Sequence, residues 1–248
     1  MVAILPAAGL GTRMAKLTGG TPKELVTLGR HSVLERVIDE AIVAGADEIV
    51  VVSSRSKPQI EEQIAEWRKG RFREANLRVA YQDKPCGLSD AILSAQVTDD
   101  ALVMLADSVI FGNSPSPRMA NLLEIGLAGC IAVEMVSDAE VHRYGMCEVD
   151  DVGTIRRIVE KPQPSQIVSR WAVAARYAFS AAVMSALPHW LAEEAATREP
   201  GEIPLTPLLI RAIADGAELK AVALQPDQKR VDCGTPEEYE AARRLNWD

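Results

Sequence analysis

Cysteine and histidine are both scarce in this chain, and their spacing limits the chemistry open to it. The four cysteines lie far apart and form no C-x-x-C pair, which argues against a zinc site and favours isolated, reduced thiols in a cytoplasmic protein. The three histidines have no serine, cysteine or aspartate at helical spacing, so we assign them no catalytic role. The residues concerned are Cys86, Cys130, Cys147, Cys233, His31, His142 and His189.

The chain also lacks an excess of positive charge and any membrane-targeting segment. Its 27 basic and 35 acidic residues give a formal net charge of −8. This balance argues against nucleic acid or a membrane surface as a partner and leaves small anionic substrates to a local basic cluster. The first residues are apolar but have no basic lead-in, and Pro6 interrupts them. We therefore expect neither a signal peptide nor a membrane span.

A glycine-rich turn follows the first apolar run, but it lacks the residues of two familiar nucleotide-binding motifs. The turn "AAGLGTR" covers residues 7–13. Met14 stands where a dinucleotide fingerprint needs its third glycine, which disfavours a hydride-transferring enzyme, and no Gly-Lys-Ser/Thr follows as in a P-loop. Gly9 and Gly11 still leave the backbone open to a ligand, and Arg13 adds a fixed positive charge. The turn is either a phosphate site or a plain tight strand-to-helix connection.

Length and hydrophobic patterning predict an α/β protein. With 248 residues, 48% of them hydrophobic and 25% charged, the chain can form one large domain or two small ones. Short, uniformly apolar runs recur between helical patterns, which indicates a mostly parallel sheet with helices on both faces. These runs are "VAIL", "EIVVV", "LRVAY", "ALVMLA" and "CIAVEMV". We expect repeated β-α units in a doubly wound sheet up to about residue 136.

The helices of this half carry their own start and stop signals. Ser32 and Glu35 form a capping box, the apolar stripe that follows includes Ile42, and Gly45 is placed to end the helix. Further helices are expected after Pro58, near residues 90–97 and near residues 118–127.

Beyond about residue 136 the pattern predicts a small antiparallel insertion. The segment "RYGMCEVDDVGTIRRIVEKP" has shorter, more polar strands, with turn signals at Tyr144-Gly145 and around Gly153. A helix over 207–214, the strand "LKAVAL" and a helix over 236–245 then complete a single domain.

Two aspartates end apolar runs. Asp107 closes "LVMLAD", and Asp232 follows Val231 before a Cys-Gly turn. Open α/β sheets bind ligands at the carboxyl ends of their strands, and a carboxylate buried there needs a cation. Together the two could hold one Mg²⁺, which takes one or two carboxylates together with phosphate oxygens. The alternative for Asp107 is the N-cap of a helix.

Two motifs contain a lysine beside a glutamate. Lys23 lies in "PKE", and Glu160-Lys161 lies in "VEKP" at the end of a predicted strand. Each lysine could bind an anion. The alternative for Lys23 is a solvated surface charge, and for the second pair it is two exposed side chains on opposite faces of a strand.

Taken in order, these motifs resemble the sugar-phosphate nucleotidyltransferases, and most of all their bacterial UTP–glucose-1-phosphate uridylyltransferase branch. The resemblance covers nearly the whole chain. "GLGTR…PKE" with a late "DCG" is specific to that branch, whereas "EKP" and the strand-end aspartate also occur in thymidylyl- and adenylyltransferase relatives. The matching segments are "AAGLGTRM", "PKE", "QDKPCGLSDA", "LADS", "YG", "VEKP", "ARYAFS", "GEIPLT" and "DCGTPEEY".

The resemblance implies a Mg²⁺-dependent enzyme in which a sugar 1-phosphate attacks the α-phosphorus of an NTP and pyrophosphate leaves. It implies a nucleotide-binding half over about 1–136, a sugar-binding half over about 137–248, and a homo-oligomer, either dimer or tetramer. Its residue assignments are catalytic Arg13, Lys23 and Lys161; nucleotide-binding Ala8, Gly9, Gly11, Gln82 and Gly87; sugar-binding Gly145, Glu160 and Lys161; and Mg²⁺-binding Asp107 and Asp232.

UTP and glucose 1-phosphate are the favoured substrates by this resemblance, with dTTP a close second. The chain departs from the family at Ser89 and Asp90, where a small residue and then histidine or glutamine are usual, and at Pro207, where aspartate is common. The alternatives are a thymidylyl- or other NDP-sugar pyrophosphorylase, or a catalytically silent relative that binds nucleotide or sugar phosphate.

Overall fold

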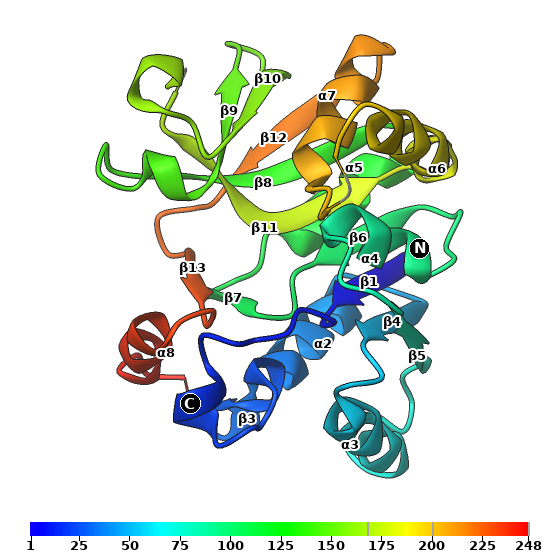
Figure 1. Cartoon of the computed structure of the whole chain (residues 1–248), viewed down its shortest axis with the longest axis vertical. Helices are drawn as coiled ribbons and strands as arrows, with labels where there is room; N and C mark the ends of the chain where they lie inside the picture. Colours follow the sequence, from blue (N-terminus) through cyan, green and yellow to red (C-terminus); the bar gives the residue numbers. More distant parts are fainter. Residues whose placement is uncertain (168, 200, 248) are drawn as a thin grey trace.

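Within residues 1–167, 169–199 and 201–247, which the computed structural model describes, the chain folds around a nine-stranded sheet (Figure 1). The main path through the sheet is β10-β9-β11-β6-β1-β4-β5; β8 pairs with β11, and β12 pairs with β8. These strands are β1 (Val2–Pro6), β4 (Glu48–Ser53), β5 (Leu77–Tyr81), β6 (Ala101–Met104), β8 (Gly129–Met135), β9 (Gly145–Val149), β10 (Ile155–Glu160), β11 (Trp171–Phe179) and β12 (Leu219–Ala223).

Two short ribbons and the helices complete the described chain. In the ribbons, β2 (Thr27–Leu28) pairs with β3 (His31–Ser32), and β7 (Ser108–Phe111) pairs with β13 (Lys229–Asp232). The α-helices are α1 (Ala15–Thr18), α2 (Val33–Val43), α3 (Pro58–Lys69), α4 (Leu88–Ser94), α5 (Ser116–Glu124), α6 (Ala181–Ala196), α7 (Leu205–Ala214) and α8 (Pro236–Arg243). Three 3₁₀ turns are described, η1 (Lys23–Leu25), η2 (Val141–Arg143) and η3 (Pro164–Gln166).

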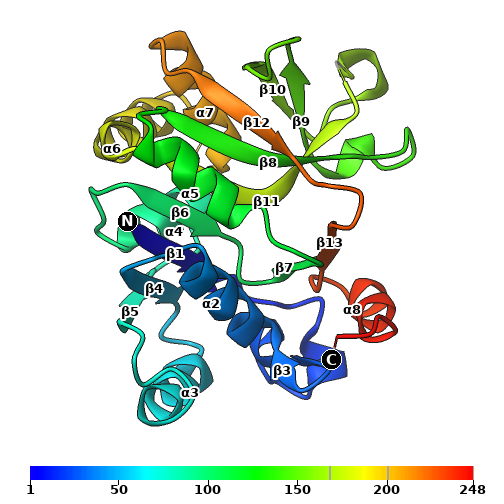
Figure 2. The same ribbon diagram turned by 180° about the vertical axis from the view of Figure 1, so that it is seen from behind.

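The sheet is apolar on both faces because each face has its own core. Strand β1 shows the alternation: Ala3 and Leu5 point into one core, and Val2 and Ile4 point into the other. The first core is completed by α2, α3 and α5, and the second by α4, α6 and α7. Figure 2 shows α2 and α5 across one face, and Figure 1 shows α6 and α7 across the other. The prediction of a sheet covered on both faces is confirmed.

Local signals at α2 act as predicted. The Ser32 Oγ accepts a hydrogen bond from the Glu35 amide, and the Glu35 carboxylate accepts one from the Ser32 amide. At the other end Gly45 adopts φ +82°, and the Ala46 amide reaches back to the Ala41 carbonyl, which caps the helix. The prediction for Ile42 is wrong: Ile42 is 42% exposed, because the buried stripe runs on through Ala41 and Ala44 and leaves Ile42 outside it.

The long strand β11 is a feature that the sequence patterns did not predict. It runs antiparallel to β6, β8 and β9 and lies between β6 and β8. The run "CIAVEMV" in β8 therefore has an antiparallel neighbour on one side and a parallel neighbour, β12, on the other. The strands β5, β4, β1 and β6 are parallel as expected. Helix α6, which contains Pro188, was also not predicted. The central position of β11 places a strand from the second half of the chain inside the sheet of the first half.

The predicted antiparallel insertion is confirmed as the β9–β10 hairpin. Its turn is held by the Asp150 carboxylate, which accepts from the amides of Val152 and Thr154, and Gly153 adopts φ +79°. The turn predicted at Tyr144-Gly145 is wrong, because Tyr144 is extended and the chain turns earlier, in η2. Among the described residues, no helix combines the length and apolar character needed to cross a bilayer.

Candidate functional site

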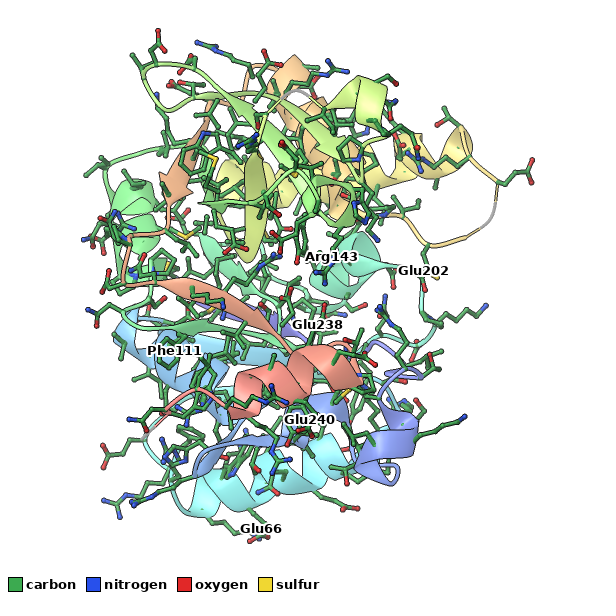
Figure 3. All side chains as sticks on the ribbon, turned by 90° about the vertical axis from the view of Figure 1, so that its left-hand side faces the viewer. Glu66, Phe111, Arg143, Glu202, Glu238 and Glu240 are labelled. Atoms are coloured by element: carbon green, nitrogen blue, oxygen red, sulfur yellow. The ribbon has the colours of Figure 1, made fainter. Side chains whose placement is uncertain are left out.

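A cleft of about 690 Å³ opens where the turn after β6, the β9–β10 hairpin, β11, α7 and α8 come together. Figure 3 looks toward this side of the molecule, where the lining residues Arg143, Glu202 and Glu238 are labelled. Arg143 of η2 forms an ion pair with Glu238 of α8, which links the hairpin side of the cleft to the C-terminal helix. A smaller hollow of about 220 Å³ adjoins the cleft and shares Gly87 and Asp107 with it.

The structure brings nearly all of the predicted site residues to these two hollows. The cleft is lined by Arg13, Gly87, Asp107, Gly145, Glu160, Lys161 and Asp232, and the adjoining hollow by Ala8, Gly9, Lys23, Gln82, Gly87 and Asp107. Gly11 lies instead beside a neighbouring depression, which it lines with Lys23. The predicted sugar-binding residues therefore line the cleft and not the smaller hollow, whereas residues predicted to contact the nucleotide line both. The two hollows share Asp107.

A buried ion pair between Lys57 and Glu24 holds the start of the glycine-rich turn in place. The Ala7 amide donates to the Val52 carbonyl at 2.8 Å, and the Lys57 Nζ donates to the Ala7 carbonyl at 2.8 Å. The same Nζ lies 3.0 Å from both carboxylate oxygens of Glu24, whose side chain is 1% exposed. Burial lowers the pKa of Lys57 and raises the pKa of Glu24. Sequence patterns did not identify this pair, because its members lie 33 residues apart.

Backbone conformation explains one of the two glycines in this turn. Gly11 adopts φ +63°, a region that favours glycine, and a Cβ there would meet the Lys23 side chain at 3.8 Å. A Cβ on Gly9 would meet nothing within 4 Å. Packing therefore does not require glycine at position 9. What glycine does provide there is a backbone without a side chain, which a ligand in the hollow can approach.

Lys23 and Asp107 form an ion pair at the junction of the two hollows. The Lys23 Nζ lies 2.5 Å from the Asp107 Oδ2, and the lysine side chain is 13% exposed. Burial by itself would lower the pKa of Lys23 and raise the pKa of Asp107, but their mutual attraction outweighs it: the pKa of Lys23 is raised and the pKa of Asp107 is lowered. The surface alternative for Lys23 is therefore wrong. Asp107 also caps no helix, because it lies in the turn between β6 and β7.

Asp232 lies next to Asp107 because β13 pairs with β7. The Cys233 amide donates to the Asp107 carbonyl at 2.9 Å, and Asp232 faces Ser108 in the register of the ribbon. Burial raises the pKa of Asp232, the negative charge of Asp107 raises it further, and Arg230 opposes the shift. The Arg230 Nη1 lies 3.6 Å from the Asp232 Oδ2.

This carboxylate pair fits a divalent cation. Two negative charges held together in a partly buried place destabilise each other, and a cation between them would relieve that repulsion. Mg²⁺ takes one or two protein carboxylates and fills its shell with phosphate oxygens and water. No group of three or more His, Cys, Asp or Glu side chains that could hold a metal occurs among the described residues. An ion at this pair would thus depend on oxygens from substrate and solvent.

The sequence patterns missed two arginines near the carboxylate pair: Arg176 bonds the turn that carries Asp107, and Arg230 lies beside Asp232. Arg176 of β11 is 1% exposed, and its guanidinium bonds the Glu40 carboxylate of α2 at 2.6 and 2.9 Å and the Ser108 carbonyl at 2.9 Å. Arg230 pairs with Glu134 at 2.7 Å, and its guanidinium lies 3.8 Å from the centre of the Tyr144 ring. The first set of contacts links β11 to α2, and the second links β13 to β8.

The opposite end of the cleft presents Glu160 and Lys161 together. Strand alternation would send neighbours to opposite faces, but Lys161 adopts φ +42°, which breaks the alternation just as β10 ends. Both residues line the cleft, and both are exposed. The Thr206 Oγ1 donates to the Glu160 Oε2 at 2.5 Å, and the Lys161 amide donates to the Tyr144 carbonyl at 3.1 Å. Non-glycine residues in this conformation occur most often at functional sites.

Gly145 leaves room for the Glu160 carboxylate. A Cβ at position 145 would lie 3.3 Å from the Glu160 Oε2, closer than side chains usually pack. Pro207, one of the departures from the family pattern, lies beyond this point and lines a separate pocket of about 420 Å³ with Arg156, Arg157 and Arg198.

One wall of the smaller hollow is built around Gln82 and Gly87. Gly87 adopts φ +99°, and a Cβ there would lie 2.5 Å from the Ile203 carbonyl oxygen, so only glycine fits. Ser89, a departure from the family pattern, donates to the Pro204 carbonyl at 2.9 Å. The second departure, Asp90, accepts a hydrogen bond from the Gln82 side chain.

Comparisons with known proteins agree with this arrangement. A family model described as nucleotidyl transferase matches residues 2–245. The UTP–glucose-1-phosphate uridylyltransferase of Bacillus subtilis is 30% identical over 94% of this chain and 86% of its own length. A UTP-bound UGPase from Acinetobacter baumannii has a TM-score of 0.80 at 28% identity, over 98% of this chain and 91% of its own. A UDP-glucose pyrophosphorylase complexed with UDP-glucose has a TM-score of 0.83 at 26% identity, over 98% of this chain and 96% of its own. The sheet, the paired hollows and these matches together establish that the chain belongs to the nucleotidyl transferase family.

Proposed function

We propose that this protein transfers a uridylyl group from UTP to glucose 1-phosphate and releases pyrophosphate. The observation that carries the proposal is the meeting of two hollows at Asp107, one with the glycine-rich turn, Lys23 and Gln82, and the other with Glu160 and Lys161. The similar proteins named above for UTP–glucose-1-phosphate uridylyltransferase activity, or solved with UTP or UDP-glucose, support the same assignment.

The reaction is an in-line displacement at phosphorus. A phosphate oxygen of glucose 1-phosphate forms a bond to the α-phosphorus of UTP, and the bond from that phosphorus to the bridging oxygen of pyrophosphate breaks. The attacking oxygen is already anionic, so no general base is needed, and the work of the protein is to position the reactants and neutralise their charge.

The positive side chains divide this work between the two substrates. In our proposal Arg13 faces the leaving pyrophosphate, Lys23 neutralises the nucleotide phosphates, and Lys161 grips the sugar phosphate. The backbone from Ala8 through Gly9 to Gly11 cradles the nucleotide. Glu160 accepts hydrogen bonds from sugar hydroxyls beside the Gly145 backbone, and the Thr206 contact holds its carboxylate in place.

We further propose that Asp107 and Asp232 bind Mg²⁺. When bound, the ion would stabilise the negative charge that develops at the reacting phosphate. The two carboxylates fit it because they lie side by side and offer the oxygen ligands that Mg²⁺ prefers. Lys23 and Arg230 now pair with these carboxylates, so the ion would have to displace them or share the oxygens with them.

A pyrophosphate-release screen tests the proposed function. Each of four NTPs is paired with several sugar 1-phosphates, with Mg²⁺ or with excess chelator. We expect release with UTP and glucose 1-phosphate, weaker release with dTTP, and none under chelation. Wild-type protein that binds UTP but releases no pyrophosphate with any pair would favour the catalytically silent alternative. Turnover only with dTTP would favour a thymidylyltransferase.

Three coarser features also belong to the proposal. We propose that the chain acts as one domain with nucleotide- and sugar-binding halves near 1–136 and 137–248, since β11 joins the two. We propose a homo-oligomer, either dimer or tetramer, as the family resemblance implies. The four free cysteines suit a reducing compartment such as the cytoplasm. Light scattering during size-exclusion chromatography measures the assembly.

A further inference from the structure

The side chain of Gln82 is held in one orientation by two hydrogen-bond acceptors. Its Nε2 donates to the Gly87 carbonyl at 2.9 Å and to the Asp90 Oδ2 at 2.8 Å. The residue is 5% exposed, and its backbone amide donates to the Ser53 carbonyl at 2.9 Å. Gln82 therefore cannot move away from this pair of acceptors.

Only one orientation of the Gln82 amide can form both hydrogen bonds, because of which groups donate and which accept. A side-chain amide has two N–H donors and one carbonyl acceptor, and a free amide could turn over to exchange them. A backbone carbonyl and a carboxylate accept hydrogen bonds and donate none. If the Gln82 amide turned over, its Oε1 would face two acceptors and both bonds would be lost. Asp90 and the Gly87 carbonyl together prevent the turn.

The Gly87 carbonyl is itself immobile. The backbone of Ile203 packs where a side chain on residue 87 would otherwise lie, and the Ile203 amide donates to the Cys86 carbonyl at 2.9 Å. The Ser89 hydroxyl, in the first turn of α4, donates to the Pro204 carbonyl and holds that turn in place as well. Because this acceptor is fixed by the backbone, Asp90 is the member of the pair that a side-chain substitution can remove.

In this orientation the Gln82 side chain presents a hydrogen-bond acceptor, its Oε1, to the hollow. Gln82 lines the hollow, and among the described residues no protein group donates to its Oε1, which is also absent from the fully buried unpartnered atoms. That oxygen is thus an acceptor open to a ligand. The described residues that line the hollow do not include Asp90, so its effect on a ligand has to pass through the Gln82 amide.

We propose that Asp90 is a positioning residue that locks the Gln82 amide so that its Oε1 selects a nucleobase with a ring N–H donor. The inference rests on the proposed function, since it needs a nucleotide in this hollow. Uracil and thymine carry a hydrogen at N3 that can donate to the Oε1. Cytosine has an unprotonated N3 that would face the oxygen as a second acceptor. Asp90 stands where the family usually has histidine or glutamine, groups that can also donate.

Binding measurements test the lock without requiring turnover. The dissociation constants of UTP and CTP are measured by calorimetry for the wild type, Asp90→Ala and Asp90→Asn, with Asp99→Asn as a matched control. Asp99 is exposed and carries the same charge. We expect the wild type to prefer UTP by about tenfold to a hundredfold, because a mismatched buried pair costs that much.

The variants should change the ratio of the two constants. Asp90→Ala should lower the preference for UTP by roughly tenfold, mainly because CTP gains affinity once the amide can turn over. Asp90→Asn should lower it less, because an asparagine can still present its oxygen to the Gln82 Nε2. Asp99→Asn should leave it unchanged. Circular dichroism of each variant confirms folding, and Asp90→Asn serves if Asp90→Ala fails to fold.

Three distinct results would overturn the inference. Equal weakening of UTP and CTP by both Asp90 variants would make Asp90 a purely structural residue. Wild-type protein that binds neither nucleotide would instead refute the proposed function, and the lock with it. Normal UTP turnover with an unchanged UTP-to-CTP ratio in the variants would refute the lock alone.

Discussion

Removing the guanidinium of Arg176 is expected to destabilise the fold by about 3–5 kcal/mol, because Glu40 is then left buried without a counter-charge. The pair is almost fully buried, with relative side-chain exposures of 1% and 7%. Two charge-assisted bonds join the two side chains at 2.6 and 2.9 Å. A loss of this size is a large share of the roughly 5–15 kcal/mol that holds a typical domain together.

The effect of Arg176→Met should depend on pH, with a sign that the structure fixes. Burial alone would raise the pKa of Glu40, but Arg176 and the hydroxyls of Ser114 and Ser116 lower it below its ordinary value. In the wild type this stability is present above the unfolded-state pKa of about 4.3 and is lost as the pH falls through the folded-state pKa. Without Arg176 burial dominates and the folded-state pKa of Glu40 rises. The difference between the variant and the wild type should therefore be largest near pH 7 and should shrink steadily as the pH falls toward and below the unfolded-state pKa.

Urea denaturation followed by circular dichroism at pH 7 and pH 5 measures both effects. The double variant Glu40→Leu/Arg176→Met is the control, because replacing both charges with apolar groups costs less than stranding one. The reasoning fails if Arg176→Met loses under 1 kcal/mol at pH 7, if its loss does not shrink at pH 5, or if the double variant is less stable than the single one.

The remaining predictions concern the proposed chemistry. Asp107→Asn or Asp232→Asn should lower kcat on the order of 10²-fold with the fold intact, and excess chelator should abolish wild-type turnover in a pyrophosphate-release assay; turnover that survives chelation would exclude the metal. Lys161→Ala should weaken glucose 1-phosphate binding strongly and UTP binding little by calorimetry, and the reverse pattern would show that the two lysines serve opposite substrates. Lys57→Met should raise the KM for UTP and lower the melting temperature, because it strands Glu24 and frees the Ala7 carbonyl; an unchanged KM would show that the glycine-rich turn needs no anchor.

The local features of this protein could be predicted from its sequence because their causes lie within a few residues of one another. The capping box at Ser32 and Glu35 is complete within one helical turn, and the two-sided apolar runs of β1 and β4 need only a cover on each face. The family resemblance named the candidate residues, and most of them, from Arg13 to Asp232, line the two adjoining hollows. Those residues lie in turns at strand ends, which the topology of an open sheet brings to one edge.

Contacts between segments that are far apart in the sequence were decided by the tertiary structure alone. Strand β11 enters the sheet antiparallel beside β6, and pattern matching along the chain cannot assign such a partner because strand pairing depends on topology. The Arg176–Glu40 pair joins residues 136 apart, and the left-handed backbone at Lys161 follows from how β10 ends against Tyr144. No local pattern explained the acidic residue Asp90, whereas the structure shows that its carboxylate accepts a hydrogen bond from the Gln82 amide. The sequence determined which groups are present, and the long-range contacts determined which way they face.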